Sequence, residues 1–356
     1  MGSASAFHLA RRGCKVLGID RFHPPHALGS SHGESRIIRE AYFEHPLYVP
    51  LVQRAYQLWS ELERQSRQQL FLQTSGLMIG PEDSTVVRGA KTSAETHGLS
   101  HEILSAEEVT RRFSAIQPKE GMIAICEPRA GVLFPERCIE AHLAAALAHG
   151  ATFRFNETVT KWENQNGEVE VRTTNGTYRA KQLVISSGSW IRELVSNTPT
   201  VVERQALVWF EPKMPALFAP GQCPIYLCEY ETGRYFYGFP NLGNGVKVAR
   251  HHEGANVDPN TASREVNAEE IRSVHEVIEP FLPTLSAKAM NAVACLYTNM
   301  PDENFLIDWL PGVPEVLVCS PCSGHGFKFS SVVGEIVADL LTKHKSNFDL
   351  SPFKFR

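Results

Sequence analysis

The residues Ser323-Gly324-His325-Gly326-Phe327-Lys328-Phe329-Ser330 combine two glycines with a lysine that stands between two phenylalanines. Glycine has no Cβ and lets the backbone approach a ligand closely, while the flanking rings place the lysine in apolar surroundings. Residues 332–341 follow with apolar side chains at helical spacing, and the N-terminus of such a helix presents unpaired N–H groups to an anion. The stretch predicts either a ligand site or a glycine-rich turn whose lysine reaches solvent.

Composition limits the classes of protein to which the chain can belong. It has 356 residues, enough for two interwoven domains, and a net charge of -4. Because Lys and Arg are not in excess, nothing neutralises the phosphates of a nucleic acid, and we expect no nucleic-acid partner. No apolar run approaches the roughly 18 residues of a membrane span, so we expect no membrane partner either.

The eight cysteines are scattered along a chain in which no secretory signal is visible. This pattern predicts free thiols in a cytoplasmic protein. Cys319-Ser-Pro-Cys322 is a lone C-x-x-C pair that lacks the second pair, or the spaced histidines, of a zinc site. We therefore expect no bound metal.

The N-terminal residues look like the second half of a dinucleotide-binding unit. Residues 3–12 are expected to form a helix that stops at Gly13, and residues 15–20 a buried strand that ends in Asp20. In such a unit the acid accepts a hydrogen bond from a ribose hydroxyl. The alternative is that these residues form an ordinary helix and strand that are not part of a dinucleotide-binding unit. Since the usual first strand and glycine turn are missing before Gly2, we expect Met1 to be an internal methionine of that turn, with the true start about a dozen codons upstream.

The polar stretch Gly29-Ser-Ser-His-Gly-Glu-Ser-Arg-Ile-Ile-Arg39 is expected to run into a helix. On a helix Arg36 and Arg39 would share one face, where they repel unless an anion or an electron-rich group lies between them. The alternative is a solvated basic face with Glu34 and Glu40 as partners.

The remaining pattern alternates between the two expected domains. A helix is expected at residues 48–63 and another at 136–149, and residues 72–134 predict an antiparallel sheet with peripheral helices. Strands are expected at 152–156, 159–163, 168–173 and 181–188, the last of them returning to the first sheet. Further strands are expected at 201–210, 235–239, 245–250, 294–298, 305–308 and 316–319.

Six separated motifs occur in an order that resembles one family over nearly the whole chain. They are the unit ending at Asp20, the stretch 29–39, Y-G-F-P at 237–240, V-K-V-A-R-H at 246–251, A-C-L-Y-T at 294–298 and S-G-H-G-F-K-F-S at 323–330. The chain is similar to the monomeric sarcosine oxidase and N-methyltryptophan oxidase family of flavoproteins.

The resemblance implies an α/β plus α+β fold with two discontinuous domains. A Rossmann-like FAD-binding domain with a truncated first strand would comprise residues 1–72, 135–200 and 303–356. An antiparallel-sheet substrate domain would comprise residues 73–134 and 201–302. The family's enzymes are monomers that oxidise the CH–NH bond of a secondary amino acid with O2, giving the demethylated amino acid, formaldehyde and hydrogen peroxide.

The resemblance also implies roles for individual residues. Cys295 would carry FAD through a thioether, although an isolated cysteine on a strand is more often a small buried hydrophobe. Arg39 and Lys328 would grip the substrate carboxylate, and Lys247 would assist oxygen by its charge. The other residues implied at the site are Gly2, Asp20, Ser35, Arg36, Val159, Gly188, Gly326 and again Lys328 for the cofactor, Gly324 for the substrate, and Arg36, Tyr237 and His251 around the reacting atoms.

Several alternatives stay open at the level of sequence. Sarcosine is the leading substrate and N-methyltryptophan the next, while a cyclic imino acid such as L-pipecolate would use the same carboxylate grip. From a different class, the chain could be a flavin-free module that binds carboxylates. Arg250 and the pair Cys319 and Cys322 depart from the family pattern, and we expect them to reshape the pocket.

Overall fold

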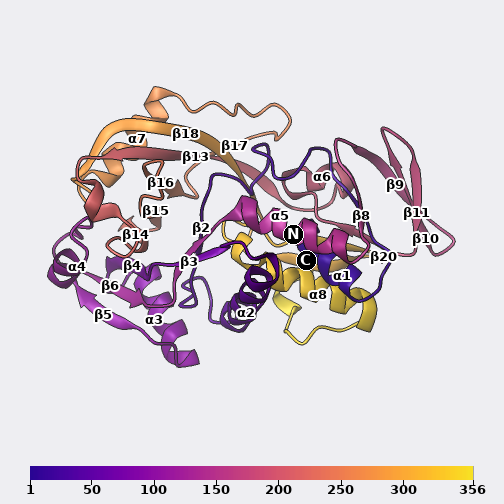
Figure 1. Ribbon diagram of the computed structural model, residues 1–356, viewed down its shortest axis with the longest axis horizontal. Helices are drawn as coiled ribbons and strands as arrows, with labels where there is room; N and C mark the ends of the chain where they lie inside the picture. The colour runs from indigo at the N-terminus through magenta and orange to yellow at the C-terminus, as the bar shows by residue number, and fades with distance from the viewer. Residues whose placement is uncertain (356) are drawn as a thin grey trace.

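A computed structural model describes residues 1–355 (Figure 1). Its largest sheet has nine strands in the order β17-β13-β16-β15-β14-β4-β6-β5, with β18 paired to β13. The neighbours are antiparallel except for β14 and β4, which run parallel. The strands predicted in residues 72–134 and those predicted after residue 200 thus form one sheet, joined through this parallel pair. The strands are β4 (Gly76–Pro81), β5 (Glu102–Ser105), β6 (Met122–Glu127), β13 (Val201–Pro212), β14 (Ile225–Glu231), β15 (Arg234–Gly238), β16 (Val246–His251), β17 (Ala255–Asn256) and β18 (Leu285–Asn299).

Two smaller sheets each contain a further parallel pair of strands. In one, β1 (Leu17–Ile19) pairs with β8 (Thr152–Arg154). In the other, β12 (Leu183–Ile185) pairs in parallel with β20 (Val313–Ser320), which also pairs with β19 (Leu306–Leu310). The expectation that residues 181–188 return to the first sheet is wrong, because within residues 1–355 β12 is hydrogen-bonded to β20 alone. A cavity lined by both β1 and β12 separates the two sheets.

The segment that carries the two arginines is a strand rather than the predicted helix. Arg36–Ile38 forms β2, which pairs with β7 (Gly131–Leu133), and β7 also pairs with β3 (Phe71–Gln73). Ile37 and Ile38 are β-branched, and such residues fit a pleated strand better than a helix. Arg39 lies one residue beyond β2, so its direction is set by the turn that follows and not by a helical face.

A three-stranded sheet of β9 (Val159–Gln165), β10 (Glu168–Thr173) and β11 (Thr177–Ala180) projects at the right edge of Figure 1. The α-helices are α1 (Gly2–Arg11), α2 (Tyr48–Ser66), α3 (Thr85–His97), α4 (Ala106–Arg112), α5 (Pro135–Ala148), α6 (Ile191–Leu194), α7 (Ala268–Ile278) and α8 (Ser330–Lys343). Short 3-10 turns occur at Gly188–Trp190, Pro215–Phe218, Phe327–Phe329 and Ser351–Phe353.

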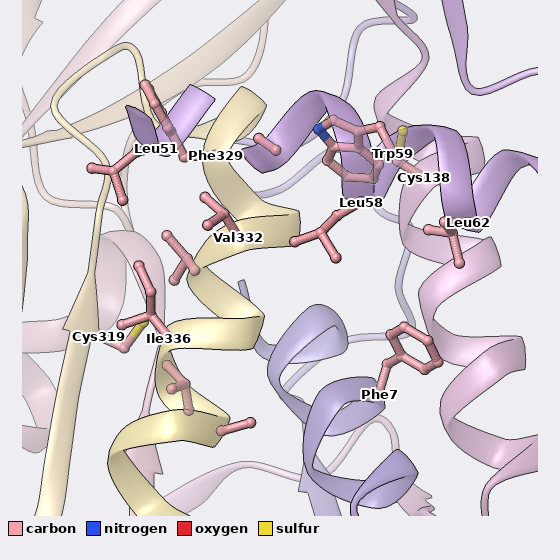
Figure 2. Packing of buried hydrophobic residues seen from close by; sticks show 14 of the residues in the cluster. Phe7, Leu51, Leu58, Trp59, Leu62, Cys138, Cys319, Phe329, Val332 and Ile336 are labelled. Carbon is pink, nitrogen blue, oxygen red and sulfur yellow. The ribbon is translucent and has the colours of Figure 1, made fainter. Parts of the chain in front are cut away.

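Helices α1, α2, α5 and α8 pack around one apolar core (Figure 2). Phe7 of α1, Trp59 of α2, Cys138 of α5 and Val332 of α8 belong to the same buried cluster. A Cβ added to Gly334 would lie 2.6 Å from the backbone carbon of Ala4, so the glycine allows α8 to approach α1 closely. This core fixes α1 and the 3-10 turn before α8 relative to each other, and both border the site.

None of the helices in residues 1–355 combines the length and the apolar character that crossing a membrane requires. The assignment of 1–72, 135–200 and 303–356 to one domain and of 73–134 and 201–302 to another stays a prediction. Arg356, the last residue of the first of these, lies outside the described residues.

Candidate active site

A cavity of about 1150 Å³ brings together most of the residues predicted for the site. Ser35 and Lys247 are the two predicted residues that do not line it. The predicted residues that do are Gly2, Asp20, Arg36, Arg39, Val159, Gly188, Tyr237, Cys295, Gly324, Gly326, Lys328 and His251.

One end of the cavity is formed by the start of α1 and the end of β1. Gly2 opens α1, whose first turn contains no acidic side chain, and both Gly2 and Ser3 line the cavity. Asp20 follows β1, and its carboxylate accepts a hydrogen bond from the amide of Phe22 at 2.8 Å. Burial raises the pKa of Asp20. Free helix N–H groups beside a carboxylate suit a phosphate and a sugar hydroxyl.

The turn 323–330 also lines the cavity. Gly324 has φ +73°, and a Cβ added to Gly326 would lie 1.7 Å from the carbonyl oxygen of Pro321, so both positions require glycine. The turn directs Lys328 inward, where its Nζ donates to the carbonyl of His325 at 2.7 Å and to the hydroxyl of Tyr42 at 3.3 Å. Burial lowers the pKa of Lys328 to about 7, and nearby Arg39 contributes to the shift.

Arg39 and Lys328 lie against the same aromatic ring. The guanidinium carbon of Arg39 is 4.3 Å, and Nζ of Lys328 5.1 Å, from the ring centre of Tyr42. Arg39 donates to the carbonyl of Ala41 at 2.8 Å and to the carboxylate of Glu44 at 2.7 Å. The carboxylate of Glu127 accepts from the amides of Glu40 and Ala41, at 2.7 Å each, which holds the backbone next to Arg39.

Arg36 lies next to the cysteine of the A-C-L-Y-T motif. Its Nη2 is 3.6 Å from Sγ of Cys295 and donates to the carbonyl of Ser30 at 2.6 Å. Cys295 is on β18 and is 2% exposed, with its side chain at the cavity wall. The thiol and the guanidinium are 259 residues apart in the sequence and meet only in the folded chain.

Lys247 lies on β16 and does not line the cavity. Its Nζ donates to the carbonyl of Gly33 at 2.7 Å and to the carbonyl and hydroxyl of Ser35 at 2.9 and 3.1 Å. The same Nζ is 4.8 Å from the ring centre of Phe239. Burial lowers the pKa of Lys247 well below its ordinary value, and Arg36 adds to the effect. Lys247 is thus a buried amine whose charged form is disfavoured, and its Nζ is 5.4 Å from the ring centre of Trp209, which belongs to the same buried cluster as Cys295.

Tyr237, His251 and Tyr297 form the remaining side of the cavity. The Tyr297 hydroxyl is 3.3 Å both from the Tyr237 hydroxyl and from Nδ1 of His251. Burial lowers the pKa of His251, and the neighbouring His252 lowers it further. The ring of His251 is therefore neutral in the ordinary pH range.

Four residues of the site were not predicted from the sequence. His32 is 5% exposed with its Nε2 unpaired among the described residues, and burial together with Arg36 and Lys247 lowers its pKa to about 3. Tyr42 and Glu44 hold Lys328 and Arg39. Only Tyr297 carried a usable signal, because it stands two residues after Cys295 on one strand and so faces the same side.

The geometry fits a flavin dinucleotide. The cavity exceeds the roughly 300 to 1,000 Å³ of most small-ligand sites, and its lining includes a helix N-terminus, a carboxylate and the Cys295 thiol with Arg36 beside it. No group of three or more metal-ligating side chains that could hold an ion occurs within residues 1–355. The fold and the site together define a flavin-dependent oxidoreductase.

The chain belongs to the FAD dependent oxidoreductase family, whose model matches residues 1–340. It is 42% identical to monomeric sarcosine oxidase of Streptomyces avermitilis over 96% of this chain and 90% of that protein. It is 34% identical to N-methyl-L-tryptophan oxidase of Escherichia coli K12 over 99% of this chain and 95% of that protein. The resemblance recognised in the motifs is confirmed, and with it the use of FAD and the classification as an enzyme.

A solved structure of NikD, an unusual amino acid oxidase essential for nikkomycin biosynthesis, superposes with a TM-score of 0.85 and 23% identity, over 99% of this chain and 94% of that one. At this identity the likeness concerns the fold alone, and it confirms the predicted fold class.

Proposed function

We infer that this enzyme oxidises N-methyl amino acids, with sarcosine the leading substrate and N-methyltryptophan the next. The observation that carries the inference is that two cations suited to a carboxylate, Arg39 and Lys328, line the same cavity as Cys295. The names of the relatives at 34 to 42% identity point to the same substrate class.

Arg39 and Lys328 bind the substrate carboxylate in this proposal. Both side chains approach one ring, that of Tyr42, so their charges converge on a small region. Charge-assisted hydrogen bonds from two separate elements fix the orientation of a carboxylate better than one element could, and orientation lowers the entropic part of the barrier. Gly324 lets the backbone approach the bound amino acid.

The surroundings keep the reacting amine uncharged. A secondary amine gives up a hydride equivalent only in its neutral form, and nearby cations disfavour the ammonium form. Arg36, Arg39 and Lys328 supply that positive potential, while His251 remains neutral. Bound FAD would supply the redox chemistry, because a flavin can accept a hydride equivalent and pass two electrons to O2. Water then converts the imine product into formaldehyde and the demethylated amino acid.

The cofactor is held from both ends of the cavity. The amides at the start of α1, beginning with Gly2, bind the pyrophosphate, and Asp20 binds the adenosine ribose. Val159, Gly188 and Gly326 line the path between, and Ser35 holds Lys247 next to the flavin end. Cys295 would hold the flavin through a covalent thioether.

Peroxide release over a panel of amino acids tests the proposed function. Purified protein should be yellow and should produce hydrogen peroxide with sarcosine, with N-methyltryptophan next, while glycine should not react. Faster turnover of L-pipecolate or proline than of any N-methyl amino acid would replace the proposed substrate class. Yellow protein that is inert with the whole panel would contradict the proposal.

The pKa of Lys328 predicts how ligand affinity depends on pH. A bound carboxylate stabilises the ammonium form and so raises the pKa of Lys328 above its free value of about 7. The affinity for a carboxylate is therefore highest below the free pKa of Lys328. It falls as pH rises through that pKa, by up to about tenfold per pH unit. His325, with a pKa of about 4, stays neutral over this range. Titration with propionate, an inert carboxylate, between about pH 6 and pH 9 should show this loss in the flavin absorbance.

Lys328→Arg is the matched control, because a guanidinium stays charged over the whole range. This variant should bind propionate with little dependence on pH. A wild-type affinity that is constant from pH 6 to pH 9 would remove Lys328 from the carboxylate site.

We further propose a monomeric protein in the cytoplasm. The eight cysteines are all unpaired, as expected where thiols are kept reduced. Sedimentation analysis and cell fractionation test the two statements.

A further inference from the structure

Three hydrogen bonds hold Nζ of Lys247, and their acceptors belong to one short turn. The acceptors are the carbonyl of Gly33 and the carbonyl and hydroxyl of Ser35. The amide of Ser35 also donates to the carbonyl of Gly33 at 2.8 Å, and this bond closes a γ-turn around Glu34. The position of Nζ therefore depends on the shape of this turn.

Glu34, at the centre of the γ-turn, has a backbone conformation that costs free energy. Its φ is +68°, in the left-handed region that side chains other than that of glycine rarely adopt. A γ-turn with a positive φ at its centre is rare and strained. Such a conformation persists only where the surrounding structure fixes it. The contacts of Glu34 must therefore offset the cost of the turn.

Three contacts from different parts of the chain fix Glu34. Its amide donates to the carboxylate of Glu136, on α5, at 3.1 Å. Its own carboxylate accepts from the indole N–H of Trp209, on β13, at 3.1 Å and from the side-chain amide of Asn244 at 3.0 Å. Trp209 is the cross-strand partner of Lys247, and Asn244 stands three residues before Lys247. The Glu34 carboxylate thus ties the γ-turn to both sides of the lysine.

The γ-turn, the tryptophan and the lysine pack against one another. The ring centre of Trp209 is 5.4 Å from Nζ of Lys247, and the same indole donates to Glu34. A Cβ added to Gly33 would lie 3.6 Å from that Nζ and 3.6 Å from the Trp209 ring. A displacement of Glu34 would therefore move the acceptors of Nζ.

The Glu34 carboxylate also favours the charged form of Lys247. Burial lowers the pKa of Lys247 and Arg36 lowers it further, whereas the carboxylates of Glu136 and Glu34 act in the opposite direction. Removal of the negative charge at Glu34 would make Nζ harder to protonate when an anion forms beside it. Within residues 1–355, neither Glu34 nor Lys247 lines the flavin cavity, so this effect is separate from substrate binding.

We propose that Glu34 is a positioning residue for Lys247, and that the reaction of the reduced enzyme with O2 depends on it. The inference rests on the proposed function, because it adds a residue to the oxygen step that Lys247 is expected to assist. Glu34 fixes the γ-turn, and the γ-turn fixes Nζ of Lys247. A preorganised Nζ stabilises the anion that forms when O2 accepts its first electron.

Glu34→Gln tests the proposal. The variant keeps the shape of the side chain, but one of the two oxygens that accept from Trp209 and Asn244 becomes an NH2 donor. Stopped-flow reoxidation of dithionite-reduced enzyme by O2 should slow about tenfold, less than the loss of about 10² to 10³ for removal of the electrostatic group itself. Reduction by sarcosine should change by less than about twofold. Normal reoxidation, or equal losses in both half-reactions, would overturn the proposal.

A double variant separates positioning from a merely structural role. If Glu34 acts through Lys247, its replacement has no further effect once the lysine is removed. Glu34→Gln combined with Lys247→Met should therefore be reoxidised no more slowly than Lys247→Met alone. Losses that multiply in the double variant would overturn the proposal.

Asn244→Ala provides a second route if Glu34→Gln does not retain flavin. It removes one of the two side-chain donors to Glu34, at an exposed position. Reoxidation should slow severalfold while reduction by sarcosine is unchanged, and an unchanged reoxidation rate would overturn the proposal. Glu211→Gln is the matched control, because Glu211 is an acid that accepts from a different lysine, Lys288, at 3.0 Å. This control should leave both half-reactions unchanged.

The two inferences fail separately, because dithionite supplies the electrons for the reoxidation measurement. If no N-methyl amino acid is oxidised but Glu34→Gln slows reoxidation, only the proposed substrate class is wrong. If sarcosine is oxidised and Glu34→Gln is reoxidised at the wild-type rate, the proposed function stands and the role of Glu34 is wrong.

Discussion

Replacing Cys295 with serine is expected to abolish covalent attachment of the flavin. The Cys295 thiol lies at the cavity wall, with its Sγ 3.6 Å from Nη2 of Arg36, and a cysteine is nucleophilic as its thiolate. A serine hydroxyl has nearly the same size but does not ionise near neutral pH. After acid precipitation the yellow colour should stay with the wild-type polypeptide and move entirely to the supernatant for the variant.

The chain offers matched controls for this experiment. Cys319 and Cys322 line the same cavity, but burial raises the pKa of both thiols, to about 12 for Cys319. Serine at either position should leave the colour attached to the protein. Flavin that stays bound in Cys295→Ser and is released in Cys322→Ser would move the attachment site to the C-x-x-C pair.

Replacing Lys247 with methionine should slow reoxidation by O2 much more than reduction by substrate. The Nζ is a buried donor fixed by Gly33 and Ser35, and burial disfavours its charge until an anion forms nearby. The first electron transfer to oxygen produces such an anion. Loss of one preorganised electrostatic group typically costs about 10² to 10³ in rate, and we expect a loss of that size in the reoxidation rate constant.

Stopped-flow measurement of the two half-reactions separates the effects. Reduction by sarcosine should change by less than about tenfold, because Lys247 does not line the cavity in which the substrate binds. Lys288→Met, which removes an exposed lysine paired to Glu211, is the control and should leave both rates unchanged. Equal losses in both half-reactions would assign Lys247 a structural role in place of the oxygen role.

Much of the site was predictable because its motifs are local. The glycines and lysine of residues 323–330, the strand with Lys247 and the strand with Cys295 each depend on neighbours within a few positions. The helix expected at residues 48–63 is α2, and the one expected at 332–341 is α8. The main error, a helix at Arg36 and Arg39, arose because a three-residue spacing was read without the pairing of β2 with β7. The hydrogen bonds of β2 to β7, a strand almost a hundred residues later, make this segment extended although the spacing of its arginines suits a helix.

The sequence by itself determined the family, the dependence on FAD and the residue types available for chemistry, since these follow from short motifs and their order. The tertiary structure alone decided which residues meet: Arg36 beside Cys295, Arg39 and Lys328 on the ring of Tyr42, and Glu44 against Arg39. The physical reason is that burial and long-range contact set the charge states and the cavities, and both come into being only when elements far apart in the chain pack together.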